Sequence, residues 1–175
     1  MDILEKRDLY DINRKLTGET IFKGEEIPKD RYIIVVLVFI QNSKGEFLIQ
    51  KRSIRKNGKY ASTGGHAKSG ETSLQGIQSE IQEEIGLSVN ENELELIYEG
   101  REDNTQVFFD IYYLKEDIDI NDLVLQEEEV ESVEWYTSNR IKELINNGLF
   151  MDSHAEEFFR MIDIFKDRGI DIENL

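Results

Sequence analysis

Apolar residues recur along the chain with two different spacings, and the spacing predicts where strands and helices lie. Residues 32–41 are apolar almost without interruption and rich in β-branched side chains, which predicts a central strand buried on both faces of a sheet. Residues 42–45 have the composition of a turn, and residues 46–52 then predict a second strand, so that the two strands form a hairpin. Further strands are predicted at residues 94–100, 107–114 and 130–136.

A spacing of three and four residues predicts helices in the later parts of the chain. The strongest example covers residues 72–85, and Gly86 marks its expected end. Its apolar stripe consists of Leu74, Ile77, Ile81 and Ile85. Two further helices are predicted at residues 138–146 and 153–167. Because strands precede, separate and follow these helices, the order of elements indicates an α/β or α+β fold, with helices packed on the faces of a mixed sheet.

The two ends of the chain have weaker patterns. Within an N-terminal segment, residues 1–30, weak alternation favours a peripheral hairpin between positions 9 and 23. Residues 150–175 are expected to contain a C-terminal helix whose apolar stripe packs either on the domain or on a second subunit, as in a homodimer. The chain has a single proline and no low-complexity run that would serve as a linker, so we expect residues 1–175 to form one domain.

The composition restricts the partners of the protein. With 37 acidic and 21 basic residues the formal net charge is -16 at pH 7, which would repel nucleic-acid polymers and anionic membranes. The longest apolar stretch is too short to span a bilayer and the polar N-terminus lacks the pattern of a signal peptide, so we expect a cytoplasmic protein. The absence of cysteine excludes disulfides, thiolate metal sites and a thiol nucleophile. A small anionic substrate would need local positive charge or a bridging metal ion.

The most informative segment is a glycine-rich loop that leads directly into the helix predicted at residues 72–85. At about 100° of rotation per residue, Glu80, Glu83 and Glu84 share one arc of roughly 100° beside the apolar stripe. Three carboxylates that close repel one another unless a divalent cation lies between them, and oxygen ligands of this kind suit Mg²⁺ or Mn²⁺. Gly76 lies on the same arc and leaves it unobstructed. The alternative is that the three glutamates form the solvated face of a surface helix.

The spacing within this segment resembles the Nudix box, in which Gly, Glu, Arg-Glu, Glu-Glu and Gly recur at fixed intervals with aliphatic residues between them. The matching positions are Gly65, Glu71, Glu80, Ile81, Glu83, Glu84, Gly86 and Leu87. The single departure is Ser79, which stands where the family has arginine. The predicted hairpin before the box and the run from Glu129 to Trp135 also resemble segments that flank it in Nudix proteins.

The resemblance implies a Nudix-type α/β/α sandwich with a mixed central sheet, and Mg²⁺- or Mn²⁺-dependent hydrolysis of a diphosphate linkage in a nucleoside diphosphate derivative. Carried over by position, Glu80, Glu83 and Glu84 would be the catalytic metal ligands, and Gly65 would offer its backbone carbonyl to the metal. Glu71 would brace the loop against the helix. In many Nudix subfamilies the general base lies outside the box. Besides Glu80, the candidates for the base or a further metal ligand are Glu127, Glu128 and Glu129, unless these form a plain acidic loop.

Ser79 raises a specific question. In the family, the arginine pairs with box glutamates and orients the catalytic one, and serine is too short and uncharged for that task. A cluster of basic residues precedes the box: Lys51, Arg52, Arg55, Lys56 and Lys59. It could replace the arginine, bind substrate phosphates through Arg52 and Arg55, or be a solvated strand end. His66 could contact the substrate or hydrogen-bond the loop, and Tyr32 or Tyr60 could stack on a base.

A narrower resemblance connects the chain with the branch of Nudix proteins that is similar to isopentenyl diphosphate isomerase. It is carried by residues 9–11, 50–53 and 65–66. That enzyme is understood to use a catalytic cysteine and further histidine metal ligands, whereas this chain has no cysteine and two histidines, so isomerase chemistry is not expected. Because of Ser79, the alternative to hydrolysis is a catalytically weak nucleotide-binding or regulatory module. The intact glutamates favour the hydrolase, since a lost active site has no reason to keep its most repulsive charges.

Overall fold

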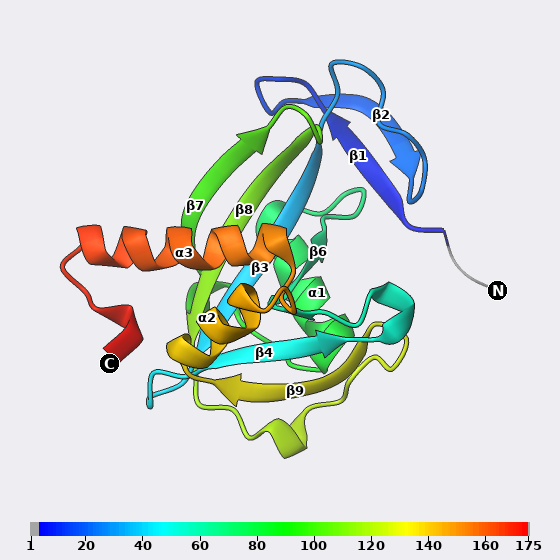
Figure 1. The fold of residues 1–175 in the computed structure, drawn as a ribbon. Helices are drawn as coiled ribbons and strands as arrows, with labels where there is room; N and C mark the ends of the chain where they lie inside the picture. Colours follow the sequence, from blue (N-terminus) through cyan, green and yellow to red (C-terminus); the bar gives the residue numbers. More distant parts are fainter. Residues whose placement is uncertain (1–3, 175) are drawn as a thin grey trace.

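A mixed β-sheet runs through the centre of the molecule between two layers of helix (Figure 1), as seen in a computed structural model that describes residues 4–174. Helix α1 covers one face of this sheet, and α2 and α3 cover the other. The strands of the sheet are β3 (Ile33–Gln41), β4 (Phe47–Arg52), β5 (Tyr60–Ala61), β6 (Thr63–His66), β7 (Glu95–Glu102), β8 (Val107–Lys115) and β9 (Val130–Tyr136). The helices are α1 (Ser73–Ile85), α2 (Ser138–Asn146) and α3 (Asp152–Asp167). The predicted α/β/α sandwich is therefore confirmed.

The strand order is β5-β4-β3-β8-β7, with β6 paired to β3 and β9 paired to β4. Strands β3 and β8 are parallel, and the other pairs in the sheet are antiparallel. This combination makes the sheet mixed, as the sequence predicts.

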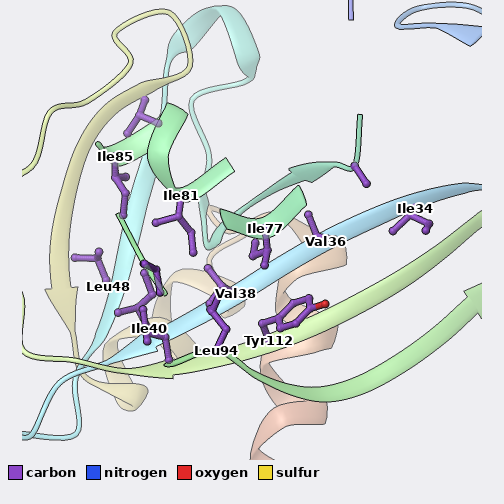
Figure 2. Packing of buried hydrophobic residues seen from close by; sticks show 14 of the residues in the cluster. Ile34, Val36, Val38, Ile40, Leu48, Ile77, Ile81, Ile85, Leu94 and Tyr112 are labelled. Atoms are coloured by element: carbon purple, nitrogen blue, oxygen red, sulfur yellow. The ribbon is translucent and has the colours of Figure 1, made fainter. Parts of the chain in front are cut away.

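Strand β3 is buried on both faces, because its apolar residues alternate between two separate cores. Val36 and Val38 point toward α1, where they pack with Ile77 and Ile81 (Figure 2). Leu37 and Phe39 point the opposite way and pack with Phe158 and Met161 of α3. The almost unbroken apolar run thus reflects a strand with a helical layer on each side.

The hairpin predicted for β3 and β4 is closed only near its turn. The two strands pair at Gln41 and Phe47 and then separate. Beyond that point the free edge of β3 is taken by β6, while β4 pairs with β5 and β9. The start of the predicted glycine-rich loop, residues 64–66, is instead part of strand β6, which is held by backbone hydrogen bonds and therefore needs no side chain at its glycines.

Helix α1 has a strong signal at each end. Thr72 caps its N-terminus in a reciprocal capping box with Gln75, and Gly86 ends it in the left-handed conformation at φ 70°. The prediction that Gly76 leaves open space beside the glutamates is wrong. A Cβ atom there would lie 3.1 Å from both Cα and Cβ of Ala67, so this glycine instead allows α1 to approach the loop that follows β6.

The N-terminal segment forms the predicted hairpin, with β1 (Lys6–Tyr10) antiparallel to β2 (Leu16–Phe22). A bridge between Tyr10 and Tyr32 joins this hairpin to the start of the central strand. At the other end of the chain, the apolar stripe of residues 150–165 packs on the sheet through Phe150, Phe158, Met161 and Phe165. Among residues 4–174, no helix is long and apolar enough to cross a membrane.

Candidate active site

A cavity of about 1660 Å³ opens where β3 and β4 separate. One wall carries the glutamates of α1 together with Gly64, Gly65 and His66 of β6. The N-terminal strand β1 and residues of β7, β8 and α3 also line the cavity. Segments that are far apart in the sequence therefore meet at one site.

The three box glutamates differ in their exposure. Glu80 and Glu84 are buried, each with 8% of its surface exposed, whereas the side chain of Glu83 is 47% exposed. Two of the three carboxylates thus lie in the cavity wall, shielded from bulk solvent. This excludes the solvated-face alternative for these two. Gly65 makes this packing possible, because a Cβ atom there would lie 2.4 Å from Cδ of Glu80.

Burial changes the acidity of the two enclosed carboxyl groups. It raises the pKa of Glu80 to about 7; the Lys68 ammonium opposes this shift and Glu83 adds to it. Burial likewise raises the pKa of Glu84 to about 8, reinforced by the charge of Glu80. The N–H of Gly64 donates a hydrogen bond to Glu84 Oε2 at 3.3 Å and partly offsets the effect. These two groups therefore carry an electrostatic cost that a cation at the site would relieve.

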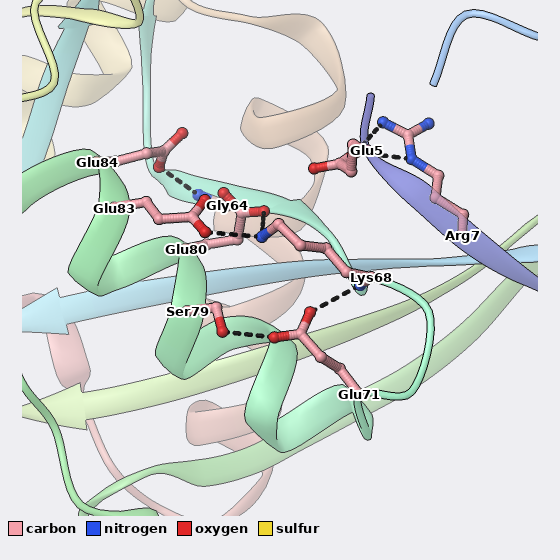
Figure 3. A network of polar contacts seen from close by, with 9 residues as sticks. All are labelled: Glu5, Arg7, Gly64, Lys68, Glu71, Ser79, Glu80, Glu83 and Glu84. Carbon is pink, nitrogen blue, oxygen red and sulfur yellow. Dashed lines mark hydrogen bonds and ion pairs between the residues drawn. The ribbon is translucent and has the colours of Figure 1, made fainter. Parts of the chain in front are cut away.

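An ammonium group lies among these carboxylates. Lys68 Nζ is 2.9 Å from Glu83 Oε1 and 3.7 Å from Glu80 Oε1 (Figure 3). The nitrogen is shielded from solvent, and its contact with Glu83 is an ion pair without good hydrogen-bond geometry. Burial opposes the charge of Lys68, but the neighbouring glutamates outweigh it and raise the pKa of the ammonium.

Ser79 and Glu71 form a second part of the same network (Figure 3). The Ser79 hydroxyl donates a hydrogen bond to one oxygen of Glu71. The other oxygen accepts a hydrogen bond from the backbone N–H of Lys68 at 2.7 Å. Glu71 therefore links the helix to the loop before it, which agrees with the bracing role that the sequence suggested.

Comparisons with known proteins agree with this geometry. The family model described as NUDIX domain matches residues 31–157. An uncharacterized Nudix hydrolase of Listeria monocytogenes is 35% identical over 154 residues, which cover 85% of this chain and 89% of the relative. The chain belongs to the Nudix hydrolase family.

Two solved structures share the Nudix fold. A protein of Deinococcus radiodurans superimposes with a TM-score of 0.73 at 22% identity, over 90% of this chain and 98% of the other. The NUDIX domain of Shewanella oneidensis NrtR, whose structure is a complex with ADP ribose, gives a TM-score of 0.60 at 13% identity, over 79% of this chain and 89% of the other. At these identities the likeness concerns the fold.

The donor atoms of the Nudix box fit a hard divalent cation in their chemistry. Glu80, Glu83 and Glu84 offer carboxylate oxygens, and Gly65 lies directly against Glu80. Within the described residues 4–174, however, no three acidic or histidine side chains converge as a ready set of metal ligands. Glu80 and Glu83 instead converge on Lys68. For a metal ion to bind these carboxylates, the Lys68 ammonium would therefore have to move away from them.

The predicted basic cluster is divided between two pockets. Arg52 and Lys56 line the main cavity, where Arg52 donates to the sulfur of Met151 at 2.9 Å and Lys56 pairs with Glu129 at 3.2 Å. Arg55 lies in the short helical turn Ile54–Lys56 and lines a separate, smaller pocket. The structure thus brings Arg52 to the site but not Arg55, and it adds Lys56.

The acidic loop before β9 is divided in a similar way. Glu128 and Glu129 line the main cavity, and Glu129 is near enough to Glu84 to raise its pKa further. Glu127 lines only the smaller pocket. Ser53 fixes this loop by bonding the backbone carbonyls of Glu128 and Glu129, at 2.7 and 3.0 Å. Of the three predicted candidates, Glu128 and Glu129 are therefore placed to act at the site.

Both histidines reach the cavity as neutral groups. His66 pairs with Val35 across the β3–β6 ladder, and burial lowers its pKa to about 4. His154 lies in the first turn of α3, and burial likewise lowers its pKa to about 4. Its Nδ1 accepts a hydrogen bond from the backbone N–H of Ser62 at 3.1 Å, so the ring carries its proton on Nε2.

The two tyrosines suggested for stacking on a base do not line the main cavity. Tyr32 is buried against Phe108 in the α1 core, and Tyr60 packs against Tyr136. The aromatic residues of the cavity are Tyr98 and Phe109, whose ring centroids are 5.8 Å apart. Phe108 and Phe109 are neighbours on β8 and so point to opposite faces, which makes Phe108 a core residue and leaves Phe109 facing the cavity.

The sequence patterns also did not indicate several cationic residues of the cavity, among them Arg160 and Arg7. The guanidinium of Arg160 lies 4.4 Å from the ring centroid of Tyr98 and 5.8 Å from that of Phe109. Arg7 on β1 pairs with Glu5 at 2.7 Å. The local sequence pattern of α3 and β1 did not indicate either residue, because the other parts of the cavity wall come from distant segments of the chain.

Proposed function

We propose that the chain is a metal-dependent Nudix pyrophosphohydrolase that cleaves a diphosphate linkage in a nucleoside diphosphate derivative. The observation that carries the proposal is the burial of Glu80 and Glu84 on the wall of a large cavity, beside the more exposed Glu83. Burying a carboxylate is costly unless a cation balances its charge. A divalent cation that also binds substrate phosphates would balance it here. We further propose that residues 1–175 act as one domain.

Each part of the cavity wall has a task in this proposal. Glu80, Glu83, Glu84 and the carbonyl of Gly65 would hold Mg²⁺ or Mn²⁺. When bound, such an ion polarises a phosphoryl group and lowers the pKa of an attacking water. Arg52 and Lys56 bind the phosphates from β4 and the turn that follows it. His66, a neutral ring that lines the cavity, would offer a hydrogen bond to the substrate.

The general base is assigned to a carboxylate that reaches the cavity. Glu80, Glu128 and Glu129 meet this condition, and Glu127 does not. Glu129 already pairs with Lys56, so a substrate phosphate that attracts Lys56 would release the Glu129 carboxylate. We therefore place Glu129 first among these three candidates.

The far side of the cavity fits a nucleobase. Tyr98 and Phe109 present aromatic surface there, and Arg160 adds a planar cation. The related fold of the NrtR domain binds ADP ribose, which contains both a base and a diphosphate. ADP-ribose is therefore the first substrate to test.

The test is release of phosphate or nucleoside monophosphate from a panel of diphosphate compounds. The panel contains ADP-ribose, nucleotide sugars and nucleoside di- and triphosphates, each with Mg²⁺, with Mn²⁺ and with EDTA. Metal-dependent cleavage of at least one compound is expected. No cleavage of any compound, combined with a thermal shift on nucleotide binding, would contradict the hydrolase and support a catalytically weak nucleotide-binding module.

A further inference from the structure

The box carboxylates need a neighbouring cation when no metal is bound, and Ser79 cannot supply one. Its hydroxyl is engaged with Glu71, on the side of the helix turned toward the loop. Glu80 and Glu84 are nevertheless buried on the same stretch of α1. Wherever these carboxyl groups are ionised without a metal, another cation must balance their charge.

Lys68 is the cation that contacts Glu80, and it contacts the more exposed Glu83 as well, whereas Glu84 accepts a hydrogen bond from the N–H of Gly64. The Lys68 ammonium pairs with Glu83 at 2.9 Å and lies 3.7 Å from Glu80. Other basic side chains of the cavity wall are engaged elsewhere. In the described part of the chain, Arg52 donates to the sulfur of Met151, and four more form ion pairs: Arg7 with Glu5, Lys56 with Glu129, Arg101 with Asp103 and Arg160 with Glu157.

The backbone around Lys68 is held firmly, so that the side chain starts from a fixed point. The N–H of Lys68 donates to Glu71, and that of Ala67 donates to the carbonyl of Ile34 at 3.0 Å. Asp8 of β1 holds the rest of the loop by accepting hydrogen bonds from the Ser69 hydroxyl at 2.6 Å and the Gly70 N–H at 2.9 Å. The loop is thus fixed on both sides of Lys68.

Ser79 and Lys68 are connected through Glu71. The serine hydroxyl occupies only one of the two oxygens of Glu71. The second oxygen remains available for the N–H of Lys68. The residue that departs from the Nudix box therefore helps to fix the loop that carries the new cation.

We infer that Lys68 is a positioning residue of the active site, which holds Glu80 and Glu83 in place from the loop where the Nudix box would use an arginine on the helix. The inference rests on the proposed function, since these glutamates must be metal ligands for their positions to affect turnover. Lys68 acts through them and not on the substrate.

The first test measures metal affinity and turnover of Lys68→Ala together. Removing a positive charge from the carboxylates should tighten Mn²⁺ binding, measured by electron paramagnetic resonance, by about fivefold. Loss of positioning should lower kcat about 10- to 100-fold while KM stays nearly constant. Lys51→Ala is the matched control, because Lys51 forms a similar ion pair with Glu131 at 3.3 Å and lines only the smaller pocket.

The second test is rescue by an arginine on the helix. Ser79→Arg in the Lys68→Ala background should recover at least about a third of the lost kcat, because a long cation one residue before Glu80 can reach the same carboxylates. A purely structural role for Lys68 predicts no such recovery. Lys68→Arg should retain most of the activity.

Three results would overturn the inference: unchanged kcat in Lys68→Ala, weaker Mn²⁺ binding in that variant, or no recovery in the double variant. If the wild-type protein cleaves no diphosphate at all, the proposed function fails. The Mn²⁺ titrations then still decide the inference, because tighter binding in Lys68→Ala but not in Lys51→Ala supports the contact and equal binding refutes it.

Discussion

Single residues at this site are specified by the space around them. Gly64 and Gly65 are neighbours on β6, yet their side-chain positions face opposite layers. A Cβ atom on Gly65 would meet the Glu80 carboxylate, whereas one on Gly64 would lie 2.5 Å from the backbone carbonyl of Val36. The first glycine is therefore required by the active site and the second by the sheet.

This difference predicts separate effects for two matched substitutions. Gly65→Ala should displace the flexible Glu80 side chain and lower kcat by about 100-fold, with a small change in stability. Gly64→Ala should push against backbone and lower the free energy of unfolding by about 1–3 kcal/mol. Urea denaturation and steady-state kinetics of both variants check this. Equal losses of stability would show that Gly65 serves the sheet as well.

The buried glutamates also predict how stability depends on pH in the absence of metal. Their pKa values, about 7 for Glu80 and about 8 for Glu84, exceed the ordinary value of 4.5, so the folded state binds more protons than the unfolded state up to that range. Their contribution to stability is present at low pH and is lost as the pH rises. The lowered pKa values of His66 and His154 act in the opposite direction, but below about pH 6.5.

Between pH 6.5 and 8, therefore, the melting temperature in EDTA should fall, and Glu84→Gln should make the fall shallower. Thermal melts at several pH values with excess EDTA provide the measurement. A melting temperature that rises over this range would show that the two carboxyl groups are not protonated in the folded protein.

At the scale of elements, the predictable parts were those with a strong apolar pattern. Strands β3 and β9 and helices α1, α2 and α3 follow from the spacing of their apolar residues, and Gly86 marks the end of α1. Strand β6 could not be predicted, because glycine has little strand propensity and its partner β3 supplies the order. The contact between Lys68 and Glu83 was also hidden, since it depends on how a loop folds back over a helix.

The caps of α1 and α2 provide a test of what the first helix does. Thr72 and Thr137 each accept a hydrogen bond from the backbone at the start of their helix, at 3.1 and 3.3 Å. Replacing either by alanine should cost about 1 kcal/mol of stability. Only Thr72→Ala should also lower kcat, several-fold, because α1 carries the glutamates. A similar loss of kcat in Thr137→Ala would mean that the loss comes from lower stability and not from the position of the glutamates on α1.

At the scale of the whole molecule, the cavity joins two ends with different chemistry. The carboxylates come from α1, and the aromatic wall comes from β7, β8 and α3. Fold class was readable from the order of elements, but this meeting of distant segments was not, because no local pattern records it. The homodimer suggested for the C-terminal segment stays a prediction, and the stripe that suggested it is largely buried within the chain.

The aromatic wall predicts which substrates depend on Phe109. Phe109→Ala should raise KM about tenfold for a substrate with a nucleobase, since stacking contributes about 1–3 kcal/mol, and should leave kcat nearly unchanged. A diphosphate without a base should be unaffected. Phe159→Ala is the control, because Phe159 is an exposed aromatic residue of α3 that does not line the described cavity. If Phe109→Ala raises KM equally for the substrate with a nucleobase and for the diphosphate without one, the nucleobase does not bind at Phe109.

The most direct test of the central claim is turnover of the Glu83→Gln/Glu84→Gln double variant on the best substrate of the panel, in Mg²⁺ and in Mn²⁺. Glu127→Gln serves as the control, because Glu127 lines only the smaller pocket. We expect the double variant to remain folded, to lose at least about 100-fold in kcat and to lose its thermal shift with Mn²⁺, while the control behaves as the wild type. Turnover in the double variant equal to that of the control would contradict the account.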